Sequence, residues 1–152
     1  MADGIRLMCW PTPDRLMIGI QIKALDGQLH HETEDLVQLD TGYSEEILLP
    51  HGLFEALNLA RWRLPRALAP RATIVTGQVV QFLEAYADVV IPRTGEQHRV
   101  IVQTFVGNTR FLVGRAFLRR FRVLLDGPGG QTCLLTNIEP IDPVCGRGPG
   151  SI

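Results

Sequence analysis

The stretch at residues 36–50 reads LVQLDTGYSEEILLP, and the rest of the sequence is best read outward from it. Apolar and polar residues alternate up to Leu39, which is typical of a strand with one buried face. Asp40-Thr41-Gly42 follows directly, and the apolar run 47–49 comes a few residues later. Pro50 then opens a segment with apolar residues at helical spacing, where the missing N–H of proline does no harm. The order predicts a strand, a polar loop and a helix.

A second stretch, at residues 111–126, reads FLVGRAFLRRFRVLLD. It predicts a strand that ends at Gly114, a short helix over residues 115–120 and a strand over residues 122–126. An isolated Asp-Thr-Gly is weak evidence, because it makes a good turn and occurs by chance in roughly a few per cent of chains of this length. Two strand–glycine–helix units in this order are more informative than either one.

Most of the remaining sequence has the period of two that strands show. Asp26-Gly27 is typical of a hairpin turn, because glycine accepts a positive φ without steric cost. A second hairpin is expected over residues 72–91, with its bend near Thr76-Gly77. The strands expected in addition to these cover residues 16–25, 29–39, 98–106 and 131–136. The pattern is mainly β with two short helices, and a small closed barrel or sandwich packs so many short strands well.

The chain has 152 residues, which predicts one domain. We expect an N-terminal segment over residues 1–14, at a dimer interface, and a folded domain over residues 15–137. A glycine- and proline-rich tail over residues 138–152 is expected to be flexible.

The two stretches together resemble the signature of retropepsin-like aspartic proteases. In that family an Asp-Thr-Gly follows a strand, and two apolar residues and a glycine precede a C-terminal helix. The sequence is most similar to the single-domain bacterial branch, in which an aromatic residue, here Tyr43, follows Asp-Thr-Gly. The resemblance covers roughly residues 18–135. It implies a small closed barrel of the retropepsin-like acid protease type, with one or two short helices.

The resemblance also implies roles for individual residues. Asp40 would be the catalytic carboxylate. The residues Thr41, Gly42, Gly114 and Arg115 would support the active-site loop. The residues Tyr43, Thr76 and Gly77 would bind substrate or form a flap over it.

The position after Gly114 carries an arginine that, in the family, pairs with an acid four residues after the catalytic aspartate. Ser44 occupies that position here, and Glu45 and Glu46 follow it. Adjacent strand residues point to opposite faces, so we expect only one of the two glutamates to pair with Arg115.

The sequence contains one Asp-Thr-Gly, and a two-carboxylate site therefore needs two chains. A homodimer supplies them through its two-fold axis. The expected function is that of an aspartic endopeptidase acting on a peptide or protein substrate. Two alternatives stay open: a peptide-binding or dimerisation module of the same fold without proteolysis, and an unrelated small barrel with an incidental Asp-Thr-Gly turn.

Other features predict absences. The net charge of −1 gives no case for nucleic acid, and no segment has the roughly 18 apolar residues of a membrane span. We expect no cofactor and no metal, because His30 and His31 would point to opposite faces of a strand. Three cysteines cannot all pair within one chain, and reduced thiols in a cytoplasmic protein are the simplest expectation.

Overall fold

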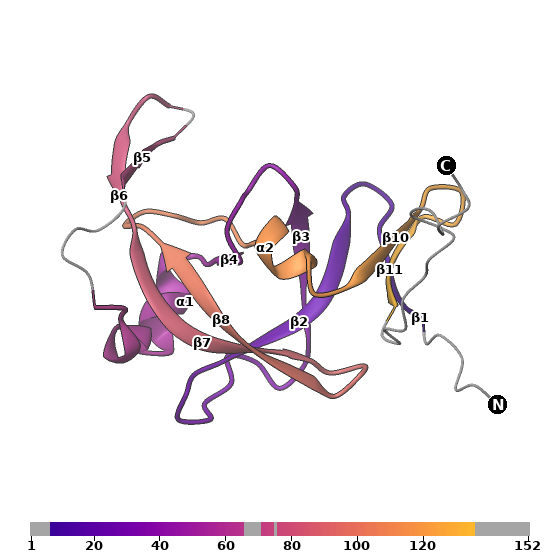
Figure 1. The fold of residues 1–152 in the computed structure, drawn as a ribbon, viewed down its shortest axis with the longest axis horizontal. Helices are drawn as coiled ribbons and strands as arrows, with labels where there is room; N and C mark the ends of the chain where they lie inside the picture. The colour runs from indigo at the N-terminus through magenta and orange to yellow at the C-terminus, as the bar shows by residue number, and fades with distance from the viewer. Residues whose placement is uncertain (1–6, 66–70, 75, 136–152) are drawn as a thin grey trace, which may run out of the picture.

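The computed structural model describes residues 7–65, 71–74 and 76–135. Figure 1 shows a barrel, one hairpin that projects from it and a small sheet at one side. The elements in chain order are β1 (Leu7–Pro11), β2 (Met17–Lys23), β3 (Asp35–Asp40), β4 (Ile47–Leu48), α1 (His51–Ala56), the 3₁₀ helix η1 (Leu59–Trp62), β5 (Arg71–Thr73), β6 (Val79–Gln81), β7 (Leu83–Ile91), β8 (Glu96–Thr104), β9 (Leu112–Gly114), α2 (Arg115–Leu118), β10 (Arg122–Asp126) and β11 (Gln131–Leu135).

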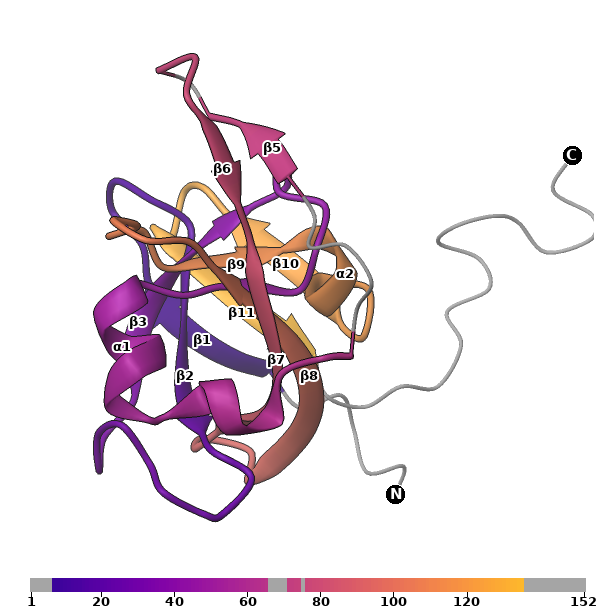
Figure 2. The ribbon, with the colours of Figure 1, turned by 90° about the vertical axis from the view of Figure 1, so that its left-hand side faces the viewer.

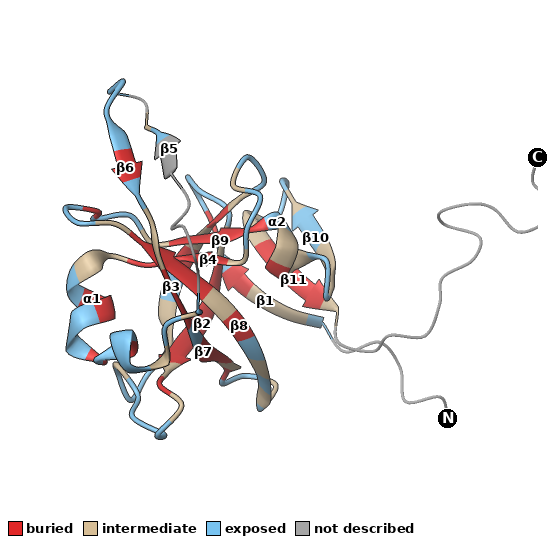
Figure 3. Ribbon diagram, turned by 60° about the vertical axis from the view of Figure 1, so that its left-hand side comes forward, coloured by how far each residue is buried: buried red, intermediate tan, exposed pale blue. Residues whose placement is uncertain are grey.

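Six strands close the barrel in the order β2–β3–β9–β4–β8–β7. Its longest ladder is antiparallel and runs from the pair Leu83–Thr104 to the pair Ile91–Glu96. The apolar residues of β2 and β7 point inward at every second position, as the period of two requires, and pack into one core (Figure 3). The predictions of a mainly β chain, a closed barrel and two short α-helices are confirmed.

Strands β5 and β6 form a separate hairpin that stands away from the barrel in both Figure 1 and Figure 2. Its turn is closed by Gly77 N–H, which donates to Ile74 O at 2.8 Å, with Gly77 in a left-handed conformation at φ 84°. Glycine suits this turn because a side chain would be strained there. The predicted bend near Thr76-Gly77 is confirmed. Only residue 82 separates β6 from β7, so the hairpin leads directly into a strand of the barrel.

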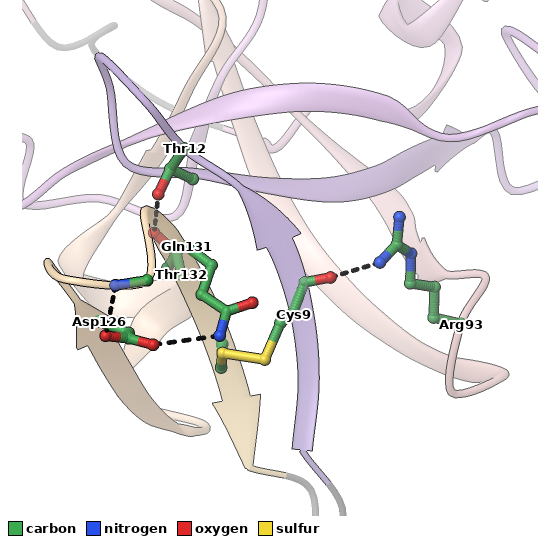
Figure 4. Close-up of a disulfide and its surroundings, with 8 residues drawn as sticks. Cys9, Thr12, Arg93, Asp126, Gln131 and Thr132 are labelled. Atoms are coloured by element: carbon green, nitrogen blue, oxygen red, sulfur yellow. Dashed lines mark hydrogen bonds between the residues drawn. A yellow bond between two sulfur atoms is a disulfide. The ribbon is translucent and has the colours of Figure 1, made fainter.

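The third sheet, β1–β11–β10, joins the two ends of the described chain. Cys9 and Cys133 face each other in its register, and a disulfide links them (Figure 4). The prediction of reduced thiols is therefore wrong for this pair, because strand pairing places two cysteines 124 residues apart side by side. Disulfides persist mainly in oxidising compartments, so the argument for a cytoplasmic location loses its basis.

Two segments differ from the predicted strands. Residues 29–34 form a loop with an isolated bridge at Leu29, because Gln21 holds the backbone oxygens of His31 and Glu32 through its amide and so turns the chain away from the sheet. Strand β1 lies in the segment assigned to the N-terminus, and its Trp10 is fully buried. Whether this segment reaches a dimer interface stays a prediction, and the tail at 138–152 lies outside the described residues. In the described part of the chain no helix is both long and apolar enough for a bilayer.

The disulfide gives the first testable prediction. Cys9→Ser should lower the free energy of unfolding by about 2–4 kcal/mol, because the bond closes a long loop in the unfolded chain. Denaturation of wild type and variant, each with and without reductant, measures this. Reductant should destabilise the wild type and leave the variant unchanged. Equal free energies of unfolding for wild type and Cys9→Ser in the absence of reductant would contradict the prediction.

Candidate active site

Asp40 is the last residue of β3, and its carboxylate is held by the turn that follows. Its Oδ1 accepts a hydrogen bond from Gly42 N–H at 2.8 Å, and its backbone oxygen accepts one from Tyr43 N–H at 3.1 Å. An aspartate that accepts from the backbone two residues on is the usual way for this side chain to fix a tight turn. Oδ2 accepts no hydrogen bond from the described residues, and the side chain is 31% exposed. One carboxylate oxygen is thus locked while the other is accessible.

Gly114 braces this turn from the neighbouring strand. β3 and β9 run parallel, and Asp40 is paired with Gly114. Gly114 N–H donates to Glu46 O at 2.8 Å, and Arg115 N–H donates to Tyr43 O at 2.9 Å. A Cβ on Gly114 would lie 2.1 Å from Glu45 O, a backbone atom that has no room to move. The close approach, rather than an unusual φ, is what requires glycine here.

The Asp40 carboxylate opens into a cleft of about 430 Å³ beneath the β5–β6 hairpin. Most of its wall is apolar. Asp40 Oδ2 lies 4.0 Å from the guanidinium Nη2 of Arg110, which is 60% exposed. The described residues that line the cleft are Asp40, Gly42, Tyr43, Leu48, Thr73, Ile74, Phe82, Phe105, Asn108, Arg110 and Leu112.

The hairpin supplies one wall of this cleft through Thr73 and Ile74. Thr76 and Gly77 lie at the exposed tip and do not line the cleft in the single chain. Their role as a flap over substrate stays a prediction, because the tip would have to bend toward Asp40 to take it up.

Tyr43 lines the cleft with its ring, but its hydroxyl points into the barrel. That hydroxyl donates to Gln103 Oε1 at 2.7 Å, and the Gln103 amide in turn donates to the buried carboxylate of Glu84. Burial raises the pKa of the Tyr43 phenol, so the group stays neutral and keeps its proton. Tyr43 therefore serves as part of the cleft floor, with no polar atom offered to a ligand.

Thr41 is exposed beside Asp40, and no hydrogen bond of its hydroxyl is found within the described residues. A second chain could reach it. The expected role of Thr41 as a brace across a dimer stays a prediction.

The expected pairing of Arg115 with a nearby glutamate is wrong. Within the described chain Arg115 makes no ion pair, and its side chain is exposed; Glu46 instead pairs with Arg120. Glu46 also accepts from Ile101 N–H at 3.0 Å, so it joins the loop to both β8 and the end of α2. At the start of α2 the backbone N–H groups of Arg115 and Ala116 face the loop and donate to Tyr43 O and Glu45 O, whereas the Arg115 side chain is exposed to solvent.

The reason given against a metal at the two histidines is also wrong. His30 and His31 lie in a loop rather than a strand, and their rings are 3.9 Å apart. With Asp35, their ligand atoms all lie within 4.8 Å of one another. Burial lowers the pKa of His30, which favours the neutral ring. The prediction that no metal binds stays untested.

Sequence reasoning identified Asp40, Gly42 and Tyr43 as site residues but missed the other described residues at the cleft: Leu48, Thr73, Ile74, Phe82, Phe105, Asn108, Arg110 and Leu112. The two phenylalanine rings stack edge-to-face at the base of the hairpin, with centroids 5.7 Å apart. Arg110 directly precedes the second signature stretch at residues 111–126, and this position was the one signal in the sequence that could have indicated it.

Comparison with solved structures shows which fold this is. The chain superposes on a retropepsin-like aspartic protease from Rickettsia conorii with a TM-score of 0.50 and 16% identity, covering 87% of this chain and 95% of that one. It superposes on the EIAV protease, in complex with the inhibitor HBY-793, with a TM-score of 0.50 and 17% identity, covering 70% and 88%. Neither a protein-family model nor a curated protein sequence matches the chain.

This chain therefore has the retropepsin-like aspartic protease fold. The expected fold type is confirmed, and the alternative of an unrelated barrel is excluded.

Gly114→Ala should destabilise the protein by about 1–3 kcal/mol, because its Cβ would force the Asp40 turn away from β9. Gly52→Ala is the matched control, since Gly52 lies in α1 with open space around the added methyl group. The control should stabilise slightly, by less than about 1 kcal/mol. Chemical denaturation of both variants measures the difference. A Gly114→Ala protein as stable as wild type would refute the bracing contact.

The Arg120–Glu46 pair can be measured by a double-mutant cycle with Arg120→Gln and Glu46→Gln. We expect a coupling free energy of about 1 kcal/mol, because Glu46 is largely buried and the pair is only partly screened. A cycle between Arg115 and Glu46 is the control and should give a coupling near zero. A larger coupling free energy for Arg115–Glu46 than for Arg120–Glu46 would support the pairing expected from the sequence.

Proposed function

We propose that this chain is an aspartic endopeptidase whose active site forms between two copies, each contributing Asp40. The observation that carries the proposal is the position of the Asp40 carboxylate. It is fixed at the end of a barrel strand, and it opens into a cleft beneath a projecting hairpin, with Oδ1 held by Gly42 N–H and Oδ2 near Arg110. The solved structures of similar fold are aspartic proteases, which supports the same reading for this cleft.

The chemistry requires two carboxylates. Two carboxyl groups about 3 Å apart cannot both ionise, because their negative charges repel, so a facing pair holds a single proton between them. The ionised carboxylate takes a proton from a water molecule held between the two, and the water oxygen attacks the peptide carbonyl carbon. The protonated carboxylate donates to the carbonyl oxygen. The proton taken from water then passes to the amide nitrogen as the C–N bond breaks, giving a free acid and a free amine.

The single chain provides half of this arrangement. Within the described residues the cleft contains Asp40 and no other acid. Asp40 and Thr41 both reach solvent at the same turn, so a two-fold axis beside the turn would place two copies of each residue opposite one another. This geometry supports the proposal of a homodimer that acts on an extended peptide.

Asp40→Asn should abolish hydrolysis and leave the fold intact, because the exchange is nearly isosteric and removes only the ionisable group. Asp14→Asn is the matched control, since Asp14 is exposed in the turn before β2. Cleavage of a mixed peptide library, read by mass spectrometry across acidic to neutral pH, measures this. The proposal would be wrong if the Asp40→Asn protein still hydrolysed peptides and no other substitution at the cleft removed this activity. No cleavage by wild type at any pH would favour the peptide-binding alternative.

Thr41→Val should weaken the dimer by about 30-fold, because it removes a hydrogen bond of roughly 1 kcal/mol at each of two symmetric sites. Thr41→Ser keeps the hydroxyl and should retain the wild-type association. Sedimentation at several concentrations gives both constants. If valine and serine behave alike, the hydroxyl plays no part in association.

A further inference from the structure

Arg110 is the one cation among the described residues that line the cleft. Its guanidinium lies 4.0 Å from Oδ2 of Asp40, which is too far for a hydrogen bond but close enough for charge attraction. Within the described residues the guanidinium makes no hydrogen bond, and 60% of the side chain is exposed. Its planar set of N–H donors is therefore available to a ligand beside the Asp40 carboxylate.

The backbone beneath Arg110 is rigidly held. The Asn108 side chain is buried, and its Oδ1 accepts from Arg110 N–H at 3.1 Å while its amide donates to Arg110 O at 3.0 Å. The same amide also donates to Leu49 O, in the segment after β4. These hydrogen bonds fix the backbone of Arg110 and therefore the position of its Cα, from which the side chain extends. Only the side-chain torsions of Arg110 have to change when a ligand binds.

In the assembled site, the positive charge of the two Arg110 side chains exceeds the negative charge of the two Asp40 side chains. Two facing Asp40 carboxylates share a proton and so carry one negative charge, whereas two copies of Arg110 carry two positive charges, because a guanidinium stays protonated in proteins. The rest of the wall is mostly apolar, with Leu48, Phe82 and Phe105 among its members. A substrate with one carboxylate beside the reacting bond would balance the excess.

We infer that Arg110 is a specificity residue that selects peptides with an aspartate or glutamate next to the cleaved bond and apolar residues around it. The inference rests on the proposed function, because the cleaved bond lies at Asp40. A carboxylate and a guanidinium match as a pair of parallel N–H···O bonds, which a neutral amide cannot reproduce. An extended peptide advances about 3.3 Å per residue, so the acid selected belongs within two residues of the bond.

The test uses pairs of soluble peptides whose central residues are leucine, phenylalanine, valine and serine. Each pair differs only in glutamate or glutamine at one of the four positions that flank the central bond. For wild type we expect kcat/KM to favour glutamate about five- to tenfold at one of these positions. For Arg110→Gln the ratio should fall to about one, and for Arg110→Glu a lysine peptide should replace glutamate as the preferred substrate. Arg119→Gln, an exposed change after α2, should keep the wild-type ratio.

Binding separates this inference from the proposed function. Asp40→Asn protein, which should not cleave, is titrated with the same fluorescently labelled pairs and followed by anisotropy, with and without Arg110→Gln. Tighter binding of the glutamate peptide that depends on Arg110 supports the subsite even if wild type cleaves nothing. Equal affinities for both members of every pair, or a preference that survives Arg110→Gln, overturn the inference whether or not cleavage is seen.

Discussion

The contact between the Asp40 turn and Gly114 is the constraint on which the site depends. Asp40 sits at the end of one barrel strand and Gly114 at the end of its parallel neighbour, and the loop after Asp40 passes so close to Gly114 that an added Cβ would lie 2.1 Å from Glu45 O. Two backbone hydrogen bonds, from Gly114 to Glu46 and from Arg115 to Tyr43, close this contact. Because the barrel fixes both strands, it also fixes the direction of the carboxylate.

Support for the loop comes from several directions at once, and this explains why one departure from the expected pattern is tolerated. Glu46 meets Arg120 rather than Arg115, and it also accepts from β8. The Tyr43 hydroxyl donates a hydrogen bond to Gln103 inside the barrel. The loop is therefore rigid on its inner side, whereas Thr41 is exposed and the Asp40 side chain is partly exposed. A half-site that is rigid inside and open outside is suited to completion by a second copy.

The sequence predicted the features that local pattern controls. The period of two predicted the strands, and the resemblance to retropepsin-like proteases implied the closed barrel and the support of the Asp40 turn by Gly114. Features that depend on distant pairing were missed: strand β1, which forms only against β11, and the disulfide between Cys9 and Cys133 that this register creates. Residues 29–34 were predicted as part of the strand that returns from the Asp26-Gly27 turn, whereas the Gln21 amide that holds His31 and Glu32 is 10 and 11 residues away in the sequence. Arg110 meets Asp40 only after the barrel closes.

The central claim is that hydrolysis needs Asp40 from two chains, and mixing measures it most directly. Wild type and Asp40→Asn protein are unfolded together and refolded in varied proportions at constant total concentration, so that subunits combine at random. If two Asp40 carboxylates form the site, activity should follow the square of the wild-type fraction, and an equal mixture should retain about a quarter of it. Activity proportional to the wild-type fraction, with about half retained in the equal mixture, would show that one chain suffices and would contradict the account.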